Sequence, residues 1–94
     1  MSLTEKIVDV NQTRGVTVRF SKKARPFIEE SLWHHSQEIK REKDGSILFR
    51  ADVAEPREVL WWALQWGADA EILEPKELRE EAKKTIERMM MLYA

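Results

Sequence analysis

The sequence predicts an α+β domain with the element order β-α-β-β-α-β-α, and three observations lead to this prediction. Residues 14–20 and 46–53 alternate apolar and polar side chains, which is the period of a strand with one buried face. The pair Asp44-Gly45 stands just before the second of these segments and is typical of a tight hairpin turn. Residues 76–93 instead repeat apolar side chains every three or four positions, as an amphipathic helix does.

The first strand and the first helix are predicted within residues 14–32. The strand, 14–20, directs three apolar side chains to one face: Val16, Val18 and Phe20. Ser21 is a suitable N-cap for a helix that extends to about Leu32, with Pro26 in the first turn, where a missing N–H is tolerated. Four apolar residues of this segment lie at helical spacing: Ala24, Phe27, Ile28 and Leu32.

A β-hairpin is predicted next. Residues 34–42 hold a single aliphatic side chain, Ile39, in a polar and charged run, which suits an edge strand that resists pairing with other chains. After the Asp44-Gly45 turn, the strand 46–53 sends its apolar side chains to one face: Ile47, Phe49, Ala51 and Val53.

The second half of the chain predicts helix, strand and helix. Pro56 suits the first position of a helix and Gly67 suits its end, because glycine adopts the left-handed conformation readily. The apolar arc of this helix is wider than one contact requires, so we expect it to touch two elements. A short strand, 69–73, follows, and Pro75 starts the last helix. The apolar stripe of that helix is Leu78, Ala82, Ile86, Met89 and Tyr93.

This order matches a ferredoxin-like βαββαβ sandwich with an additional C-terminal helix, in which the first and third strands are central. We expect the folded domain to span residues 14–94. Residues 1–13 show no clear helical or strand periodicity. We expect them to comprise a remnant of expression, which begins with Met1-Ser2-Leu3, and a linker cut from a longer chain.

Composition narrows the classes of function. In 94 residues, 16 Lys and Arg against 17 Asp and Glu leave a net charge of -1, so no global field attracts nucleic acid or membrane. The chain has no cysteine, which rules out disulfides and thiolate chemistry and fits a reducing cytoplasm. Its apolar runs are far shorter than the roughly 20 residues that a bilayer requires, so we expect a cytoplasmic protein.

No catalytic or metal-binding pattern is present. The adjacent histidines, His34 and His35, would point to opposite faces of a strand and could not chelate one ion together. The serines lie in no nucleophile motif, and the three glycines are too scattered to cradle a phosphate. We therefore expect neither an enzyme nor a bound cofactor or metal. The histidine pair is expected at a helix-to-strand junction, with one ring packed and one in solvent.

Two surfaces remain as candidate sites. The open face of the sheet is expected to carry Arg19 and Arg50. Lys40 or Arg41 joins them, depending on which side of the edge strand faces outward. The guanidinium groups of arginine can bind phosphate or carboxylate through two parallel hydrogen bonds. Solvated pairs with neighbouring carboxylates are the alternative. The candidate interface residues are an amphipathic tryptophan on the charged flank of the second helix and side chains near the chain end, where there is more apolar surface than one stripe uses: Trp61, Met90, Met91 and Tyr93.

Two long stretches, 16–37 and 44–93, carry short motifs in a fixed order. The first, VTVRFSKKARPFIEESLWHHSQ, is similar to a V-x-L-R-F strand, a helix with small residues and a W-H-P-S-Q junction. The second is similar to a hairpin, an L-x-x-W-I-L-x-x-G helix, a V-L-E-P-x-x-L-R junction and a closing helix. Together they resemble the C-terminal extension, called WCX, of bacterial WYL-domain transcriptional regulators. His35 departs from the family, which usually has proline there.

The resemblance implies a parent chain with a winged helix-turn-helix domain and a WYL domain. It further implies that the WYL domain senses nucleic-acid or other anionic effectors, while the extension contributes to dimerisation and to the effector site. We therefore expect a homodimer that helps to bind an anionic effector, without specific operator binding by this chain alone. Within the junction, Trp33 is expected to be packed, and Ser36 or Gln37 to satisfy backbone groups. A small-molecule-binding or purely structural dimerisation module of another multidomain protein is the alternative.

Overall fold

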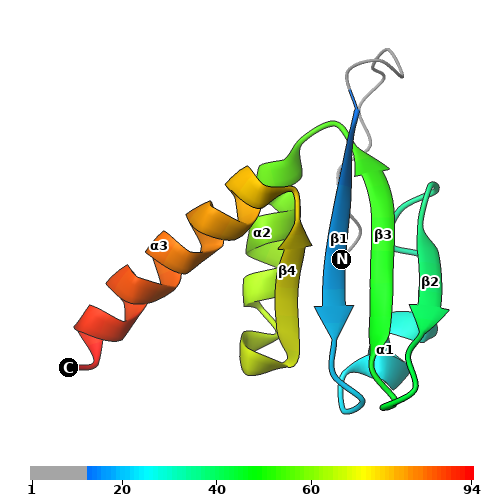
Figure 1. Ribbon diagram of the computed structural model, residues 1–94, viewed down its shortest axis with the longest axis horizontal. Helices are drawn as coiled ribbons and strands as arrows, with labels where there is room; N and C mark the ends of the chain where they lie inside the picture. Colours follow the sequence, from blue (N-terminus) through cyan, green and yellow to red (C-terminus); the bar gives the residue numbers. More distant parts are fainter. Residues whose placement is uncertain (1–12) are drawn as a thin grey trace.

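A computed structural model describes residues 13–94, and Figure 1 shows how their elements are arranged. The strands are β1 (Arg14–Phe20), β2 (Glu38–Arg41), β3 (Ile47–Val53) and β4 (Ala70–Glu74). The helices are α1 (Arg25–Glu29), α2 (Pro56–Leu64) and α3 (Lys76–Leu92), with a short 3-10 helix, η2, at Gly67–Asp69. The predicted order of strands and helices is thereby confirmed. The expected expression remnant and linker lie outside the described residues, except for Thr13.

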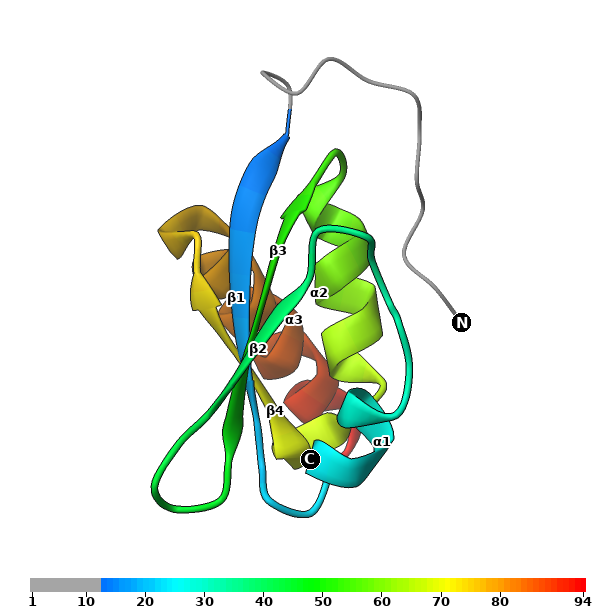
Figure 2. The ribbon, with the colours of Figure 1, turned by 90° about the vertical axis from the view of Figure 1, so that its right-hand side faces the viewer.

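The strands form one antiparallel sheet in the order β2-β3-β1-β4, so the first and third strands are central, as predicted. Val18 in the middle of β1 lies opposite Phe49 on β3 and Ile72 on β4. Figure 2 shows α1 and α2 on one side of the sheet. The α+β, ferredoxin-like fold with an additional C-terminal helix is therefore confirmed.

An aromatic cluster holds α2 against the sheet. The Trp62 side chain is 1% exposed, and its ring centroid lies 5.0 Å from that of Phe49 and 5.2 Å from those of Phe20 and Trp33. Such a ring buries roughly 150–250 Å². Val59, Leu60 and Trp62 of α2 thus form the layer that covers the apolar face of the strands, and α2 contacts β1, β4 and α3.

The first helix is shorter than predicted. Ser21 acts as expected, because its Oγ accepts a hydrogen bond from the backbone N–H of Ala24 at 3.2 Å. However, α1 ends at Glu29, and Leu32 is 72% exposed. The indole N–H of Trp33 donates to the backbone carbonyl of Ile28 at 3.0 Å. That carbonyl would have to accept from Leu32 in a longer helix, so the packed tryptophan replaces the next turn.

The apolar stripe of α3 is covered only in its first half. Leu78 and Ala82 are buried, whereas Ile86, Met89 and Tyr93 are at least 43% exposed. Figure 1 shows the reason, because α3 starts beside β4 and then runs away from the sheet. The predicted apolar stripe is therefore present, but the structure covers only its first half, since an amphipathic pattern does not reveal where its partner surface ends.

The hairpin turn is built as predicted and contains a titratable group. Gly45 has φ +93°, and Asp44 Oδ1 accepts hydrogen bonds from the Ser46 hydroxyl at 2.6 Å and from its N–H at 3.0 Å. These bonds, the hydroxyl first, lower the pKa of Asp44 because they favour the ionised carboxylate.

We expect Asp44→Asn to lower the free energy of unfolding at neutral pH. Because the folded-state pKa is depressed, the contribution of Asp44 is complete above its unfolded pKa of about 3.9 and is lost as the pH falls through the lower folded value. The difference between wild type and variant should therefore shrink on acidification, as measured by urea unfolding at a series of pH values. A constant difference would contradict this role.

None of the helices within residues 13–94 combines the length and the apolar character that a membrane crossing demands.

Candidate functional site

The face of the sheet opposite α1 and α2 carries mainly polar side chains in two rows that cross all four strands. The rows follow from the register and from alternation, because Val18, Phe49 and Ile72 occupy the other face. From β2 to β4, the first row consists of Glu38, Arg50, Thr17 and Glu74, and the second of Lys40, Leu48, Arg19 and Glu71. We call these residues the open face. The structure therefore brings three of the four predicted effector-binding residues together.

Arg19 is already engaged with carboxylates. One guanidinium nitrogen lies 3.5 Å from Glu71 Oε1, and another lies 3.6 Å from Glu42 Oε1. The Arg19 side chain is 43% exposed, so water screens both ion pairs. An anionic ligand at Arg19 would have to displace or accommodate two negative charges.

Arg50 differs from Arg19 in its surroundings. It lies between Thr17 and Glu38 in the first row, and it forms no ion pair with any residue in the range 13–94. A Cβ atom placed on Gly15 would come within 3.3 Å of both Arg50 Nη2 and Asp52 Oδ1. The absence of a side chain at Gly15 therefore makes room for the guanidinium above β1. Arg50 is the arginine of the open face whose donors are available to a ligand.

The register decides between Lys40 and Arg41. Lys40 lies opposite Leu48 on the open face, whereas Arg41 lies opposite the buried Ile47 and points to the helix side. There Arg41 Nε and Nη2 donate to the carboxylate of Glu29 at 2.9 and 3.2 Å. These hydrogen bonds, together with the positive charge, lower the pKa of Glu29. Arg41 is therefore not brought together with the other predicted residues.

The carboxylates that β4 contributes to this face were not predicted from the sequence. Glu71 and Glu74 both lie on the open face, and Thr17 Oγ1 donates to Glu74 Oε1 at 3.1 Å. The alternation about Ile72 could have placed Glu71 there, because neighbours of a buried residue point away from the core. With these residues included, the open face has a balanced charge and is not a basic patch.

The junction before β2 differs from the expected strand. His34 and His35 lie in a turn, and their rings stack with centroids 4.3 Å apart, so the prediction that they point to opposite faces was wrong. His34 is 3% exposed, and its Nδ1 accepts a hydrogen bond from the Ser36 N–H at 3.1 Å. His35 is exposed, as expected for one member of the pair. Among the described residues, no group of three metal-ligating side chains could hold an ion.

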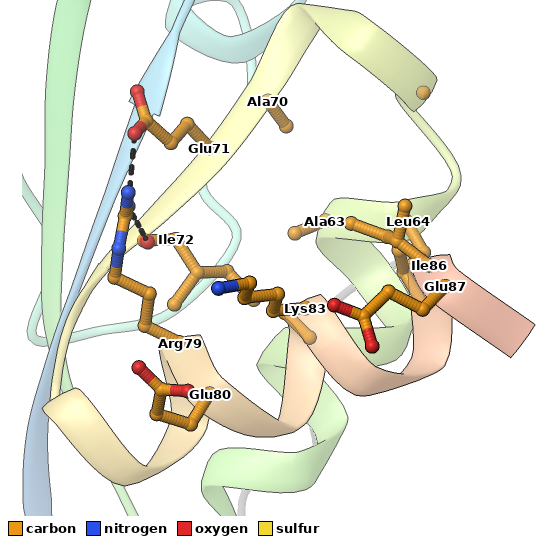
Figure 3. A pocket seen from close by; sticks show the side chains of 12 residues that line it. Ala63, Leu64, Ala70, Glu71, Ile72, Arg79, Glu80, Lys83, Ile86 and Glu87 are labelled. Atoms are coloured by element: carbon orange, nitrogen blue, oxygen red, sulfur yellow. Dashed lines mark hydrogen bonds and ion pairs between the residues drawn. The ribbon is translucent and has the colours of Figure 1, made fainter.

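A groove that the sequence did not predict lies between β4, α3 and the end of α2. Figure 3 shows the side chains that line it, and its volume is about 530 Å³. Ala63 and Ile72 contribute apolar surface from α2 and β4, and Ile86 contributes from α3. At one end, Arg79 donates to both the Glu71 carboxylate and the Ile72 carbonyl at 2.8 Å, which satisfies a backbone group on the outer edge of β4.

The predicted interface residues are all exposed. Trp61 on α2 is 54% exposed, and Met90, Met91 and Tyr93 near the end of α3 are 74–89% exposed. At about 100° per residue, Met90 and Tyr93 lie on the same side of α3 as Ile86, whereas Met91 faces another direction. Trp61 does not line the groove.

The comparison with protein families decides the affiliation of the chain. The profile of the WCX domain matches residues 12–90, which is most of the chain. The chain belongs to the WCX domain family. A search of curated proteins gave no significant match. The match to the WCX profile confirms the family affiliation that the sequence motifs implied.

Among solved structures, the WCX domain resembles part of proteasome accessory factor B/C (PafBC) of Arthrobacter aurescens. The TM-score is 0.70 at 18% sequence identity, and the match covers 86% of this chain. It covers only 12% of the PafBC chain, so this domain corresponds to a small part of that protein. At this identity, the likeness supports the fold and leaves the function to be argued separately.

The expected role of the WCX junction motif is confirmed by hydrogen bonds. Gln37 Oε1 accepts from the backbone N–H groups of Trp33 and His34 at 2.6 and 3.0 Å, and Gln37 Nε2 donates to the Ser31 carbonyl at 3.3 Å. The Ser36 hydroxyl accepts from the Asp52 N–H on β3 at 2.8 Å. The motif therefore ties the chain before β2 to the central sheet.

Proposed function

We propose that this WCX domain is the C-terminal regulatory domain of a WYL-type bacterial transcriptional regulator, acting in the cytoplasm without enzymatic activity. In that setting it contributes to dimerisation and to the binding of an anionic effector. The observation that carries the proposal is the WCX match over residues 12–90. Operator recognition belongs to other domains of the parent chain, because this chain has a net charge of -1 and a charge-balanced open face.

The open face supports the effector part of the proposal. Arg50 has a guanidinium that no carboxylate of the described residues engages, and Lys40 and Arg19 lie in the next row. A guanidinium can bind a phosphate through two parallel hydrogen bonds. The surrounding carboxylates limit the number of phosphates that the face can accept, so we expect recognition of one or two phosphate groups in place of a long polyanion.

Replacing Arg50 by alanine is expected to weaken effector binding by more than about 1 kcal/mol, or roughly fivefold in Kd, because a charge-assisted hydrogen bond is lost. Arg19→Ala is expected to have the smaller effect of the two, since Arg19 is shared by Glu42 and Glu71. The measurement is fluorescence anisotropy of the full-length regulator with a labelled short single-stranded oligonucleotide as the anionic probe.

Arg41→Ala is the control, because it removes one positive charge, as Arg50→Ala does. Arg41 is held by Glu29 on the opposite side of β2, so its removal should leave binding of the probe unchanged. If Arg50→Ala and Arg41→Ala weaken binding equally, the effect reflects net charge alone and the assignment to the open face fails.

A further inference from the structure

The same helix lines the groove and carries an uncovered apolar end. Residues 79–87 of α3 form one wall of the groove, and the following turns expose Met90 by 74% and Tyr93 by 89%. Because α3 is one continuous helix that leaves the sheet, its end cannot fold back into the groove of its own chain. Contact between the two requires another molecule.

We propose that the groove of one copy receives the end of α3 from a second copy, so that two α3 helices pair in antiparallel orientation about a two-fold axis near Ile86. This inference rests on the dimerisation in the proposed function and specifies its contact. An isologous arrangement of this kind uses the same surface twice and closes at two copies.

The spacing along α3 suits this arrangement. Ala82 and Met90 each lie four residues from Ile86, or about 6 Å along the axis at 1.5 Å per residue. In the pair, the long Met90 side chain of one copy therefore meets the small Ala82 of the other. Arg79 and Tyr93 are each seven residues away, so the Tyr93 ring reaches the end of the groove that Arg79 occupies. A small residue opposite a large one is what close packing of helices needs.

The charges beside the groove are also complementary. Lys83 and Glu87 both line the groove and lie on the same flank of α3. An antiparallel two-fold brings like flanks together, which places Lys83 of one copy about 3 Å along the axis from Glu87 of the other, within reach of both side chains. Symmetry creates this attractive pair twice, against a single like-charge approach of the two Glu87 side chains, which are also about 3 Å apart along the axis.

A charge-reversal experiment on the 94-residue chain tests the pairing. Lys83→Glu places two glutamates opposite each other on both sides of the two-fold axis, and Glu87→Lys does the same with lysines. Each variant alone should raise the dimer dissociation constant at least about tenfold in sedimentation equilibrium, because like charges face each other. An equimolar mixture of the two variants should recover a dimer, since the mixed pair has attractive contacts at both positions.

Lys84→Glu is the matched control. At about 100° per residue, position 84 is turned well away from Ile86 and Met90, so this reversal should leave the dissociation constant unchanged. Far-UV circular dichroism verifies that each variant is folded, as expected for exposed positions.

The outcomes separate this inference from the proposed function. The α3 pairing would be overturned if neither single reversal raised the dissociation constant of the dimer. It would also be overturned if the mixture of the two variants dimerised as weakly as each variant alone. Either result would leave dimerisation through another surface, such as that of Trp61. A wild-type chain that stays monomeric at millimolar concentration would overturn both the pairing and the proposed dimerisation.

Discussion

Replacing Trp62 by alanine is expected to lower the free energy of unfolding by about 3–5 kcal/mol, which is the usual cost of truncating a buried tryptophan. Trp62 is 1% exposed and contacts aromatic rings from both central strands and from the junction before β2. A domain of this size is stable by about 5–15 kcal/mol. Urea unfolding followed by far-UV circular dichroism would measure the loss without relying on tryptophan fluorescence.

Trp61→Ala is the control, because the same side chain is deleted one position earlier on α2. Trp61 is 54% exposed, so a change within about 0.5 kcal/mol is expected. Trp62→Phe should cost less than Trp62→Ala, since the Trp62 indole N–H has no hydrogen-bond partner among the described residues and its loss leaves no acceptor unsatisfied. Equal losses for Trp61→Ala and Trp62→Ala would show that α2 does not pack as the structure has it.

The second large effect is expected at Gln37. Gln37→Ala removes the oxygen that accepts from the N–H groups of Trp33 and His34, and the buried position of His34 denies its N–H a replacement by water. The expected loss is about 1–3 kcal/mol, the cost of leaving a buried donor unsatisfied. Thermal and urea unfolding of the variant would measure it.

Gln37→Glu separates the acceptor from the rest of the side chain. Glutamate keeps the oxygens that serve the two N–H groups and loses only the donation to the Ser31 carbonyl. It should therefore retain most of the stability that Gln37→Ala loses. If both variants are destabilised equally, the two accepted hydrogen bonds are not what holds the junction.

The region around the histidines shows where sequence reasoning reaches its limit. The burial of one ring and the roles of Ser36 and Gln37 could be inferred, because the motif places them between a helix and a strand. The stacking of His34 on His35 could not be inferred, because β2 begins only at Glu38 and the preceding residues form a turn. Alternation applies to side chains only after a strand has started.

The open face was predictable in part. The arginines of β1 and β3 follow from alternation within each strand. The choice of Lys40 over Arg41 could also have been made, since Ile39 is the aliphatic residue of β2 and its neighbours must point the other way. The ion pairs of Arg19 depend on β4 and on the hairpin, which lie far from β1 in sequence, and required the register of the whole sheet.

The sequence by itself determined the element order, the buried face of each strand, the hairpin turn and the affiliation with the WCX family. Only the tertiary structure decided where α1 stops and how far α3 stays in contact with β4. It also decided that a groove opens between α3, β4 and the end of α2. Periodicity reports which side chains share a face of one element. Whether another element covers that face depends on contacts between residues distant along the chain, and those contacts form only when the sheet and its helices pack together.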